Sequence, residues 1–174
     1  CIRDRVRFDI EVRQTGNITP DGADEAEFMI SVNPGEDLRP LAKIASGGEL
    51  SRIMLGIKSV LANKDDTDTL IFDEIDTGIS GRTAQKVSEK MALIARSHQV
   101  ICITHLPQIA AMADIHFLIE KNIKDGFTTT SINRLSDQEI ITELARMLGG
   151  SQITDLVMDN AAQMKEFADN LKKQ

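Results

Sequence analysis

The run Thr69–Asp76 constrains the fold more than any other stretch, because it is apolar at first and then ends abruptly in acidic residues. The apolar residues 70–72 predict a short buried strand, with Asp73 and Glu74 at its carboxyl end. An open α/β sheet places its ligand chemistry at the carboxyl ends of its strands. The sequence therefore predicts an α/β fold in which this strand delivers two carboxylates to a ligand site.

The segments that follow extend this strand into a larger unit. After Gly81, apolar residues at steps of three and four predict an amphipathic helix, and they are Ala84, Val87, Met91, Ile94 and Ala95. Residues 100–103 are then fully apolar and predict a second buried strand. Strand, helix and strand within about 30 residues form a βαβ unit. Its two strands are expected to be parallel and joined by a right-handed crossover.

Other elements are predicted on both sides of this unit. Residues 3–33 alternate apolar and polar side chains around the turn Pro20-Asp21-Gly22, which indicates a long antiparallel hairpin. From Glu49 to Leu61, apolar residues fall at helical steps. Later elements are a short helix from 106 to 113, strands at 115–120 and 127–135 around the turn Asp125-Gly126, a helix from 138 to 148 that stops at Gly149-Gly150, and a last helix between 153 and 171.

The length and composition fit one soluble domain. A chain of 174 residues has the usual size of a domain, and we divide it into a β-hairpin segment (1–40), an α/β core (41–135) and carboxyl-terminal helices (136–174). No stretch is apolar enough to span a bilayer, so we expect a cytoplasmic protein without a membrane partner. The net charge of −7 argues against a broad nucleic-acid surface on this chain. The first residue is Cys1 and not Met, which indicates a fragment of a longer protein.

Asp73 and Glu74 suit the hydrolysis of a nucleotide. Successive strand side chains alternate in direction, so the two carboxylates are expected to project to different sides. One carboxylate can hold Mg²⁺ through its water shell, while the next orients and deprotonates an attacking water. Strands also end in acidic residues without any catalytic role, and the pair alone leaves that structural interpretation open.

Two further stretches carry groups that suit phosphate. Ser46-Gly47-Gly48-Glu49 precedes the helix that runs to Leu61, and its backbone N–H groups, the helix start and the Ser46 hydroxyl form a candidate anion site. The alternative is a serine helix cap with flexible glycines. His105 follows the second strand, where a neutral imidazole can donate to a γ-phosphate or to the attacking water. The alternative is a histidine with a structural hydrogen bond.

The order of these features resembles that of an ABC-type ATPase head. Ser46–Glu49 is similar to the signature motif, residues 70–73 with Glu74 are similar to the Walker B motif and its catalytic glutamate, and His105 is similar to the switch histidine. Asp73-Glu74-Ile75-Asp76, without a proline after the glutamate, is similar to the chromosome-maintenance (SMC) branch of that family. The stretches 19–25, 46–52, 73–81, 104–110 and 145–150 further resemble a bacterial DNA-repair member of the branch.

The resemblance implies a fold and a set of roles. The chain would be the carboxyl-terminal lobe of an ABC/SMC-type P-loop ATPase head, with a parallel βαβ core, flanking antiparallel hairpins and carboxyl-terminal helices. The implied cofactors are ATP and Mg²⁺. Asp73 would serve Mg²⁺ through water, Glu74 would be the general base, and His105 would contact the γ-phosphate.

The resemblance also implies that two heads share each site. The residues expected to contact the ATP of a second head are Ser46, Gly47, Gly48 and Glu49. The residues expected in the D-loop region, which crosses the dimer interface, are Asp76, Thr77, Gly78 and Ser80. Ser80 stands where many members of the family have an aspartate, so the usual aspartate contacts are not assigned to it.

The P-loop is missing from this chain. None of its eleven glycines begins a G-x-x-x-x-G-K-[ST] pattern, so we expect the chain to be inactive as an ATPase by itself. The implied partners are an amino-terminal lobe with the P-loop and a coiled coil, a second head in a homodimer, and DNA bound through the full-length protein. The expected location is the bacterial cytoplasm, at the nucleoid.

Three hypotheses for function follow. The first is the carboxyl-terminal half of an SMC-like ATPase head that binds and hydrolyses ATP at a head-to-head interface, in DNA double-strand-break repair and recombination. The second keeps the fold but makes the chain a nucleotide-gated dimerisation module with little hydrolysis. The third is a receiver-like acidic site that uses Asp73, Thr104 and Lys121. It leaves both Ser46–Glu49 and the leading hairpin unexplained.

Overall fold

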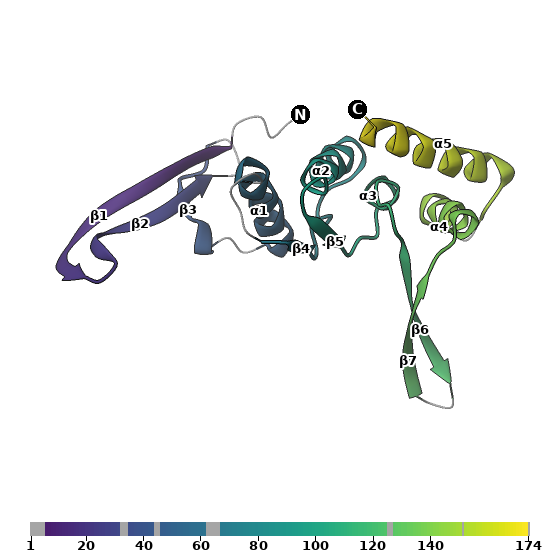
Figure 1. The fold of residues 1–174 in the computed structure, drawn as a ribbon, viewed down its shortest axis with the longest axis horizontal. Helices are drawn as coiled ribbons and strands as arrows, with labels where there is room; N and C mark the ends of the chain where they lie inside the picture. The colour runs from purple at the N-terminus through teal and green to yellow at the C-terminus, as the bar shows by residue number, and fades with distance from the viewer. Residues whose placement is uncertain are drawn as a thin grey trace. The chain divides into compact units, whose positions relative to one another are not determined.

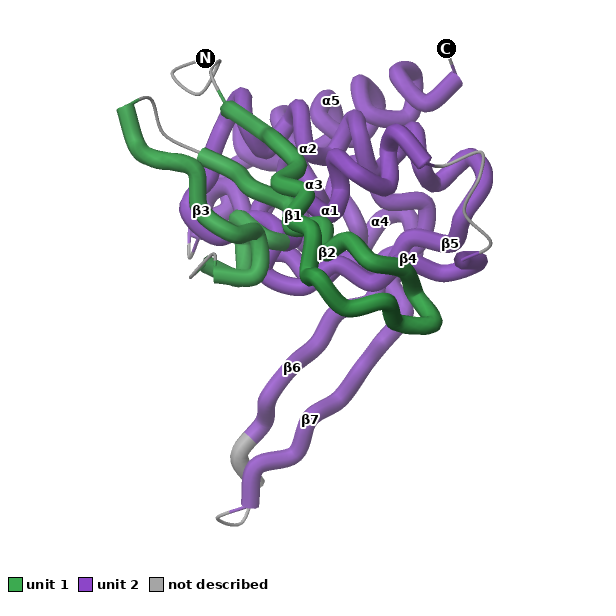
Figure 2. Tube along the Cα trace, turned by 90° about the vertical axis from the view of Figure 1, so that its left-hand side faces the viewer, with its two compact units in different colours: residues 1–50 green, residues 51–174 purple. Residues whose placement is uncertain are grey.

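The computed structural model describes residues 6–31, 35–43, 46–61, 67–124, 127–150 and 152–173. It has an α/β fold that divides into two compact units, residues 1–50 and residues 51–174 (Figure 2). The division of the sequence into segments 1–40, 41–135 and 136–174 stays a prediction.

Unit 1 is built on the predicted hairpin. Its elements are β1 (Arg7–Thr19), β2 (Gly22–Ser31), the short β3 (Arg39–Pro40) and a 3-10 turn, Leu41–Lys43. The strands are antiparallel in the order β1-β2-β3. Opposite residues share a face of the hairpin, and the rings of Phe8 and Phe28 lie 5.6 Å apart. The hairpin expected from the alternation of residues 3–33 is therefore confirmed over the described residues.

Unit 2 contains the remaining elements, which Figure 1 labels. The helix α1 (Gly47–Leu61) begins in unit 1 and continues into unit 2. The others are β4 (Thr69–Phe72), α2 (Gly81–Ile94), β5 (Gln99–Cys102), α3 (Pro107–Ala110), β6 (Phe117–Lys124), β7 (Phe127–Arg134), α4 (Asp137–Gly149) and α5 (Asp155–Lys172).

The predicted βαβ unit is present. Strands β4 and β5 are parallel and in register from Thr69 opposite Gln99 to Phe72 opposite Cys102. The helix α2 connects them and buries its apolar stripe in a core that also holds Leu70 and Phe72 from β4. The sequence predicts buried strands, and within unit 2 only one face of β4 is buried. Ile71 between those two core residues is 68% exposed, because the described elements of unit 2 cover only one face of the sheet.

A second core lies at the carboxyl-terminal end of unit 2. The helices α4 and α5 pack against each other around residues such as Leu144 and Ala161, which are fully buried. A capping box between Ser136 and Glu139 begins α4, and Gly150, with a φ of 64°, ends it. No helix among the described residues is long and apolar enough to cross a membrane.

A long hairpin of β6 and β7 extends from the body of unit 2 (Figure 2). The strands are antiparallel from Phe117 opposite Arg134 to Lys124 opposite Phe127. The first strand begins and ends later than the predicted 115–120, and the predicted helix 106–113 is reduced to the four residues of α3. The expected turn Asp125-Gly126 lies outside the described residues.

Candidate functional site

The candidate site begins in the turn that follows β4. The strand ends at Phe72, so Asp73 and Glu74 lie in a bend beyond it and not within the strand. Glu74 has a φ of 56°, and it is the one non-glycine residue among those described with a positive φ. Its N–H donates a hydrogen bond of 2.9 Å to Oδ1 of Asp73. The two carboxylates are therefore set apart by the turn, and not by strand alternation as the sequence predicts.

The left-handed backbone of Glu74 is a mark of a functional site. This conformation costs a residue with a Cβ atom roughly 1–2 kcal/mol. Such strained residues cluster where a fold holds a side chain for binding or catalysis. Both Asp73 and Glu74 are exposed, whereas the next residue, Ile75, is fully buried and anchors the turn in the core. The turn thus presents two acidic side chains from a firmly packed base.

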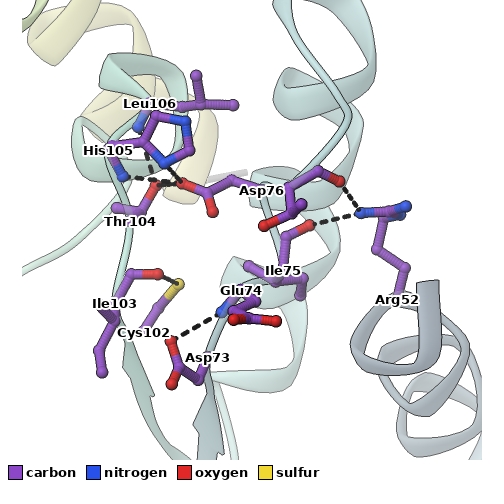
Figure 3. Close-up of polar contacts among 11 residues, drawn as sticks. Arg52, Asp73, Glu74, Ile75, Asp76, Cys102, Ile103, Thr104, His105 and Leu106 are labelled. Atoms are coloured by element: carbon purple, nitrogen blue, oxygen red, sulfur yellow. Dashed lines mark hydrogen bonds and ion pairs between the residues drawn. The ribbon is translucent and has the colours of Figure 1, made fainter. Parts of the chain in front are cut away.

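Asp76 links this turn to the end of β5 (Figure 3). It is 3% exposed, and its Oδ2 accepts a 2.7 Å hydrogen bond from the Thr104 hydroxyl and a 2.8 Å bond from the His105 N–H. The same oxygen lies 2.9 Å from Nδ1 of His105. Burial raises the pKa of Asp76, but the hydrogen bonds from Thr104 and His105, with the charge of His105, bring that pKa below its ordinary value.

These contacts fix the place of Asp76 within the turn. The sequence assigns it to the D-loop region, and the structure buries its side chain against the residues that follow β5. The reason is that a carboxylate at the end of one parallel strand meets the free N–H groups at the end of its neighbour. Asp76 therefore joins the ends of β4 and β5, and it faces Thr104 and His105.

His105 is held on one side and open on the other. Its side chain is 74% exposed although Nδ1 faces the buried Asp76. A ring that donates Nδ1–H to a carboxylate leaves Nε2 for a ligand outside. With Nδ1–H donated to Asp76, Nε2 also donates when the ring is doubly protonated. His105 is thus placed to present a hydrogen-bond donor to an anion beyond the strand ends.

Two residues of α1 also bind the acidic turn. The Ser51 hydroxyl donates a 2.9 Å hydrogen bond to the carbonyl oxygen of Asp73. Nη1 of Arg52 donates to the carbonyl oxygens of Ile75, at 3.0 Å, and of Thr77, at 2.8 Å. Neither residue stands out in the sequence, since a side chain that binds a backbone more than 20 residues away leaves no periodic pattern. In the sequence, Ser51 and Arg52 are marked only by their position within residues 46–52, a stretch that resembles the family.

The remaining residues of the predicted D-loop region lie on the surface. Thr77, Gly78 and Ser80 are exposed, and Gly78 has a φ of 73°. Ser80 precedes α2 with an extended backbone, and its carbonyl oxygen accepts from the N–H groups of Thr83 and Ala84. Its hydroxyl makes no capping hydrogen bond to the helix. These residues are accessible to another molecule, as an interface loop requires.

The predicted signature residues form the start of α1. The helix begins at Gly47, and the Ser46 carbonyl oxygen accepts a 3.0 Å hydrogen bond from the Leu50 N–H. Gly48 is buried and Glu49 is half-buried in the first turn. These residues belong to unit 1, whereas Asp73, Glu74 and His105 belong to unit 2. Their role as a phosphate site stays a prediction.

The acidic turn offers few ligands for a metal ion. Among the described residues, no three His, Cys, Asp or Glu side chains are grouped to hold one. Mg²⁺ keeps several of its waters and binds through one or two carboxylates together with substrate phosphates. The exposed Asp73 fits such a water-mediated contact when a nucleotide supplies the other ligands. It does not form a metal site by itself.

Cys102 at the end of β5 has no reactive thiol. Burial, with smaller effects from the charges of Asp76 and Asp73, raises the pKa of Cys102 to about 12. The thiolate is the nucleophilic and metal-binding form of cysteine. A thiol with this pKa stays protonated at neutral pH, so Cys102 packs as a small apolar side chain beside the acidic turn.

The α/β fold is similar to that of a solved SMC head domain. A solved Smc head domain with a coiled coil and joint from Pyrococcus yayanosii is similar to 93% of this chain and 26% of that chain, with a TM-score of 0.52. The two sequences are 19% identical, so this likeness concerns the fold. No model of a protein family matches the chain.

Sequence relatives give a narrower result. The DNA repair protein RecN of Bacillus subtilis (strain 168) is 50% identical over 159 residues, which are 91% of this chain and 28% of that relative. RecN of Halalkalibacterium halodurans is 43% identical over 173 residues, 97% of this chain and 31% of the relative. RecN of Vibrio cholerae is 46% identical over 162 residues, 92% of this chain and 29% of the relative. The chain is homologous to RecN over most of its length, and it spans about a third of the length of these relatives.

Proposed function

We propose that the chain is the carboxyl-terminal lobe of a RecN-like ATPase head, and that the whole protein binds and hydrolyses ATP while it acts in DNA double-strand-break repair and recombination. The observation that carries the proposal is the acidic turn after β4. There the strained Glu74 and the exposed Asp73 stand beside β5, whose end holds His105 through Asp76. The repair role rests on the relatives, which are named as DNA repair proteins.

In this proposal the side chains of the chain act on a bound water and on the phosphates of ATP. The carboxylate of Glu74 orients the water and accepts its proton while the water oxygen attacks the γ-phosphorus. The bond from that phosphorus to the bridging oxygen breaks, and ADP leaves. Nε2 of His105 donates to an oxygen of the γ-phosphate, and Asp73 would hold a hydrated Mg²⁺, which would neutralise phosphate charge.

Support for a shared site comes from the uncovered face of β4 and β5. Ile71, Ile101 and Ile103 are 68%, 44% and 51% exposed on this small sheet. Parallel sheets are normally covered on both faces, and burial of one such side chain contributes about 1–2 kcal/mol when roughly half of it is already covered. We therefore propose that an amino-terminal lobe, which carries the missing P-loop and a coiled coil, packs on this face.

The rest of the site would come from a second head. Ser46, Gly47, Gly48 and Glu49 at the start of α1 would close on the γ-phosphate of ATP held by that head, because a helix start favours an anion. The exposed residues Thr77, Gly78 and Ser80 would cross the interface. DNA would bind through the full-length protein, and the protein would act in the bacterial cytoplasm at the nucleoid.

The experiment combines this chain with an amino-terminal lobe that carries a P-loop. ATP binding and ATP turnover are measured for the complex and for its Glu74→Gln variant. We expect the variant to bind ATP normally and to lose turnover about 100-fold or more, the usual effect of removing a general base. Glu166→Gln, which changes an exposed carboxylate on α5, is the matched control and is expected to keep full turnover.

Two other outcomes decide between the hypotheses. If the wild-type complex binds ATP but turns it over no faster than the Glu74→Gln variant does, the chain is a nucleotide-gated dimerisation module and the hydrolase proposal fails. For the signature residues, Ser46→Arg is expected to abolish ATP-dependent dimerisation while ATP binding is unchanged. Loss of ATP binding instead would mean that Ser46 acts within its own head or in folding.

A further inference from the structure

We infer that Arg52, assisted by Ser51, is a positioning residue for the general base Glu74. This inference rests on the proposed role of Glu74 in ATP hydrolysis. Arg52 has no part in the signature, Walker B or switch motifs that define the site. It is half-buried on α1, and it acts on Glu74 through the backbone on either side of it.

The backbone hydrogen bonds of the acidic turn join it to α1. The carbonyl oxygens of Glu74 and Asp76 accept from N–H groups of the turn itself, Thr77 and Ile79. Those of residues 73, 75 and 77 accept instead from Ser51 and Arg52 on α1. Along residues 73–77, carbonyl oxygens that accept from α1 therefore alternate with carbonyl oxygens that accept from within the turn. The hydrogen bonds from Ser51 and Arg52 join the turn to a helix more than 20 residues earlier in the sequence.

These hydrogen bonds flank the left-handed residue Glu74 on both sides. Glu74, with its φ of 56°, lies between the carbonyl oxygens of Asp73 and Ile75, which Ser51 and Arg52 hold from outside. A glutamate does not choose the left-handed region by itself, so surrounding contacts must impose it. Hydrogen bonds from a charged guanidinium are roughly twice as strong as neutral ones. Arg52 is therefore the strongest single contact that holds this turn from outside.

The backbone conformation of the turn sets the direction of the Glu74 side chain. The Cα–Cβ bond leaves the backbone in a direction fixed by φ and ψ, so a left-handed Glu74 presents its carboxylate where an ordinary backbone would not. Ile75 is fully buried and fixes the turn from the core side. With Arg52 removed, two carbonyl oxygens lose their partner and the turn can relax toward a common conformation. The carboxylate of Glu74 then moves away from its working position.

The experiment uses the complex of this chain with its P-loop-bearing lobe. Arg52→Ala is expected to lower ATP turnover by about 10-fold to 100-fold, because small misplacements of a catalytic group have effects of this size. ATP affinity is expected to stay within a factor of about two, since Arg52 binds the backbone and not the nucleotide. Arg52→Lys, which keeps a donor and a charge, should recover part of the turnover. Arg96→Ala, at an exposed arginine after α2, is the matched control.

A second measurement does not depend on hydrolysis. Amide hydrogen exchange over residues 73–79 is expected to become faster in Arg52→Ala, and to a smaller extent in Ser51→Ala, while exchange in α5 is unchanged. If the wild-type complex hydrolyses no ATP, the proposed function fails, but the exchange rates still decide whether Arg52 holds the turn. The inference is overturned by unchanged exchange, by turnover equal to wild type in Arg52→Ala, or by a loss of ATP binding that parallels the loss of turnover. The milder variants Arg52→Lys and Ser51→Ala serve if Arg52→Ala does not fold.

Discussion

The strained backbone at Glu74 leads to a prediction that runs against the usual effect of glycine. Glycine adopts a φ of 56° without steric cost, so Glu74→Gly should release the roughly 1–2 kcal/mol that the left-handed conformation costs. Glycine also gains freedom in the unfolded chain, which costs roughly 0.5–1 kcal/mol. The Glu74 side chain is exposed, so its removal uncovers no core. The net expectation is a protein more stable by about 0.75 kcal/mol, the difference between the middles of these two ranges.

Thermal unfolding of the chain measures this difference. A change of 1 kcal/mol shifts the Tm of a domain of this size by about 2–4 °C, so we expect Glu74→Gly to raise the Tm by about 1.5–3 °C. Glu166→Gly, at an exposed position within α5, is the matched control and should lower stability by about 1 kcal/mol. ATP turnover by the complex with the P-loop lobe should be lost in Glu74→Gly, so that stability and activity change in opposite directions. A Tm that falls equally in both variants would refute the argument that the turn stores strain.

Other predictions follow from the strand ends. The pKa of Asp76 is lowered in the folded state, so its stabilising effect is complete above the unfolded pKa of about 3.9 and is lost as the pH falls through the folded pKa. The Tm difference between wild type and Asp76→Asn should therefore be constant near pH 6 and shrink below pH of about 4; a difference that stays constant down to pH of about 2 would contradict this. Because the pKa of Cys102 is about 12, iodoacetamide at pH of about 8 should modify it slowly in a folded Cys1→Ser variant and quickly after unfolding. Equal rates in both states would contradict its burial.

Periodicity was sufficient to predict the order of the main elements. The alternating residues of the leading hairpin and the helical steps of α1 and α2 each have a period that one type of element satisfies, whereas the apolar runs of β4 and β5 indicate strands by their short length. The parallel pairing of β4 with β5 followed from the helix between them. The glycine stop after α4 was also correct, since Gly150 takes the positive φ that ends a helix.

Tertiary contacts explain what the sequence did not reveal. The buried position of Asp76 depends on the hydrogen bonds that the end of β5 offers, and no local pattern marks it. The contacts of Ser51 and Arg52 join a helix to a backbone far along the chain, and backbone carbonyls have no signature in a sequence. The exposed face of β4 was not foreseen, because an apolar run has the same composition whether or not another part of the protein covers it.

The central claim is that each hydrolytic site combines Glu74 of one head with Ser46 of another. Heads with Ser46→Arg and heads with Glu74→Gln, each inactive alone, are mixed in equal amounts and assayed for ATP turnover. A mixed dimer has one intact site, with Glu74 from one variant and Ser46 from the other, so the account predicts turnover that neither variant has alone, up to about half of the wild-type value. A mixture that stays as inactive as its components, although mixed dimers form, would contradict the shared site.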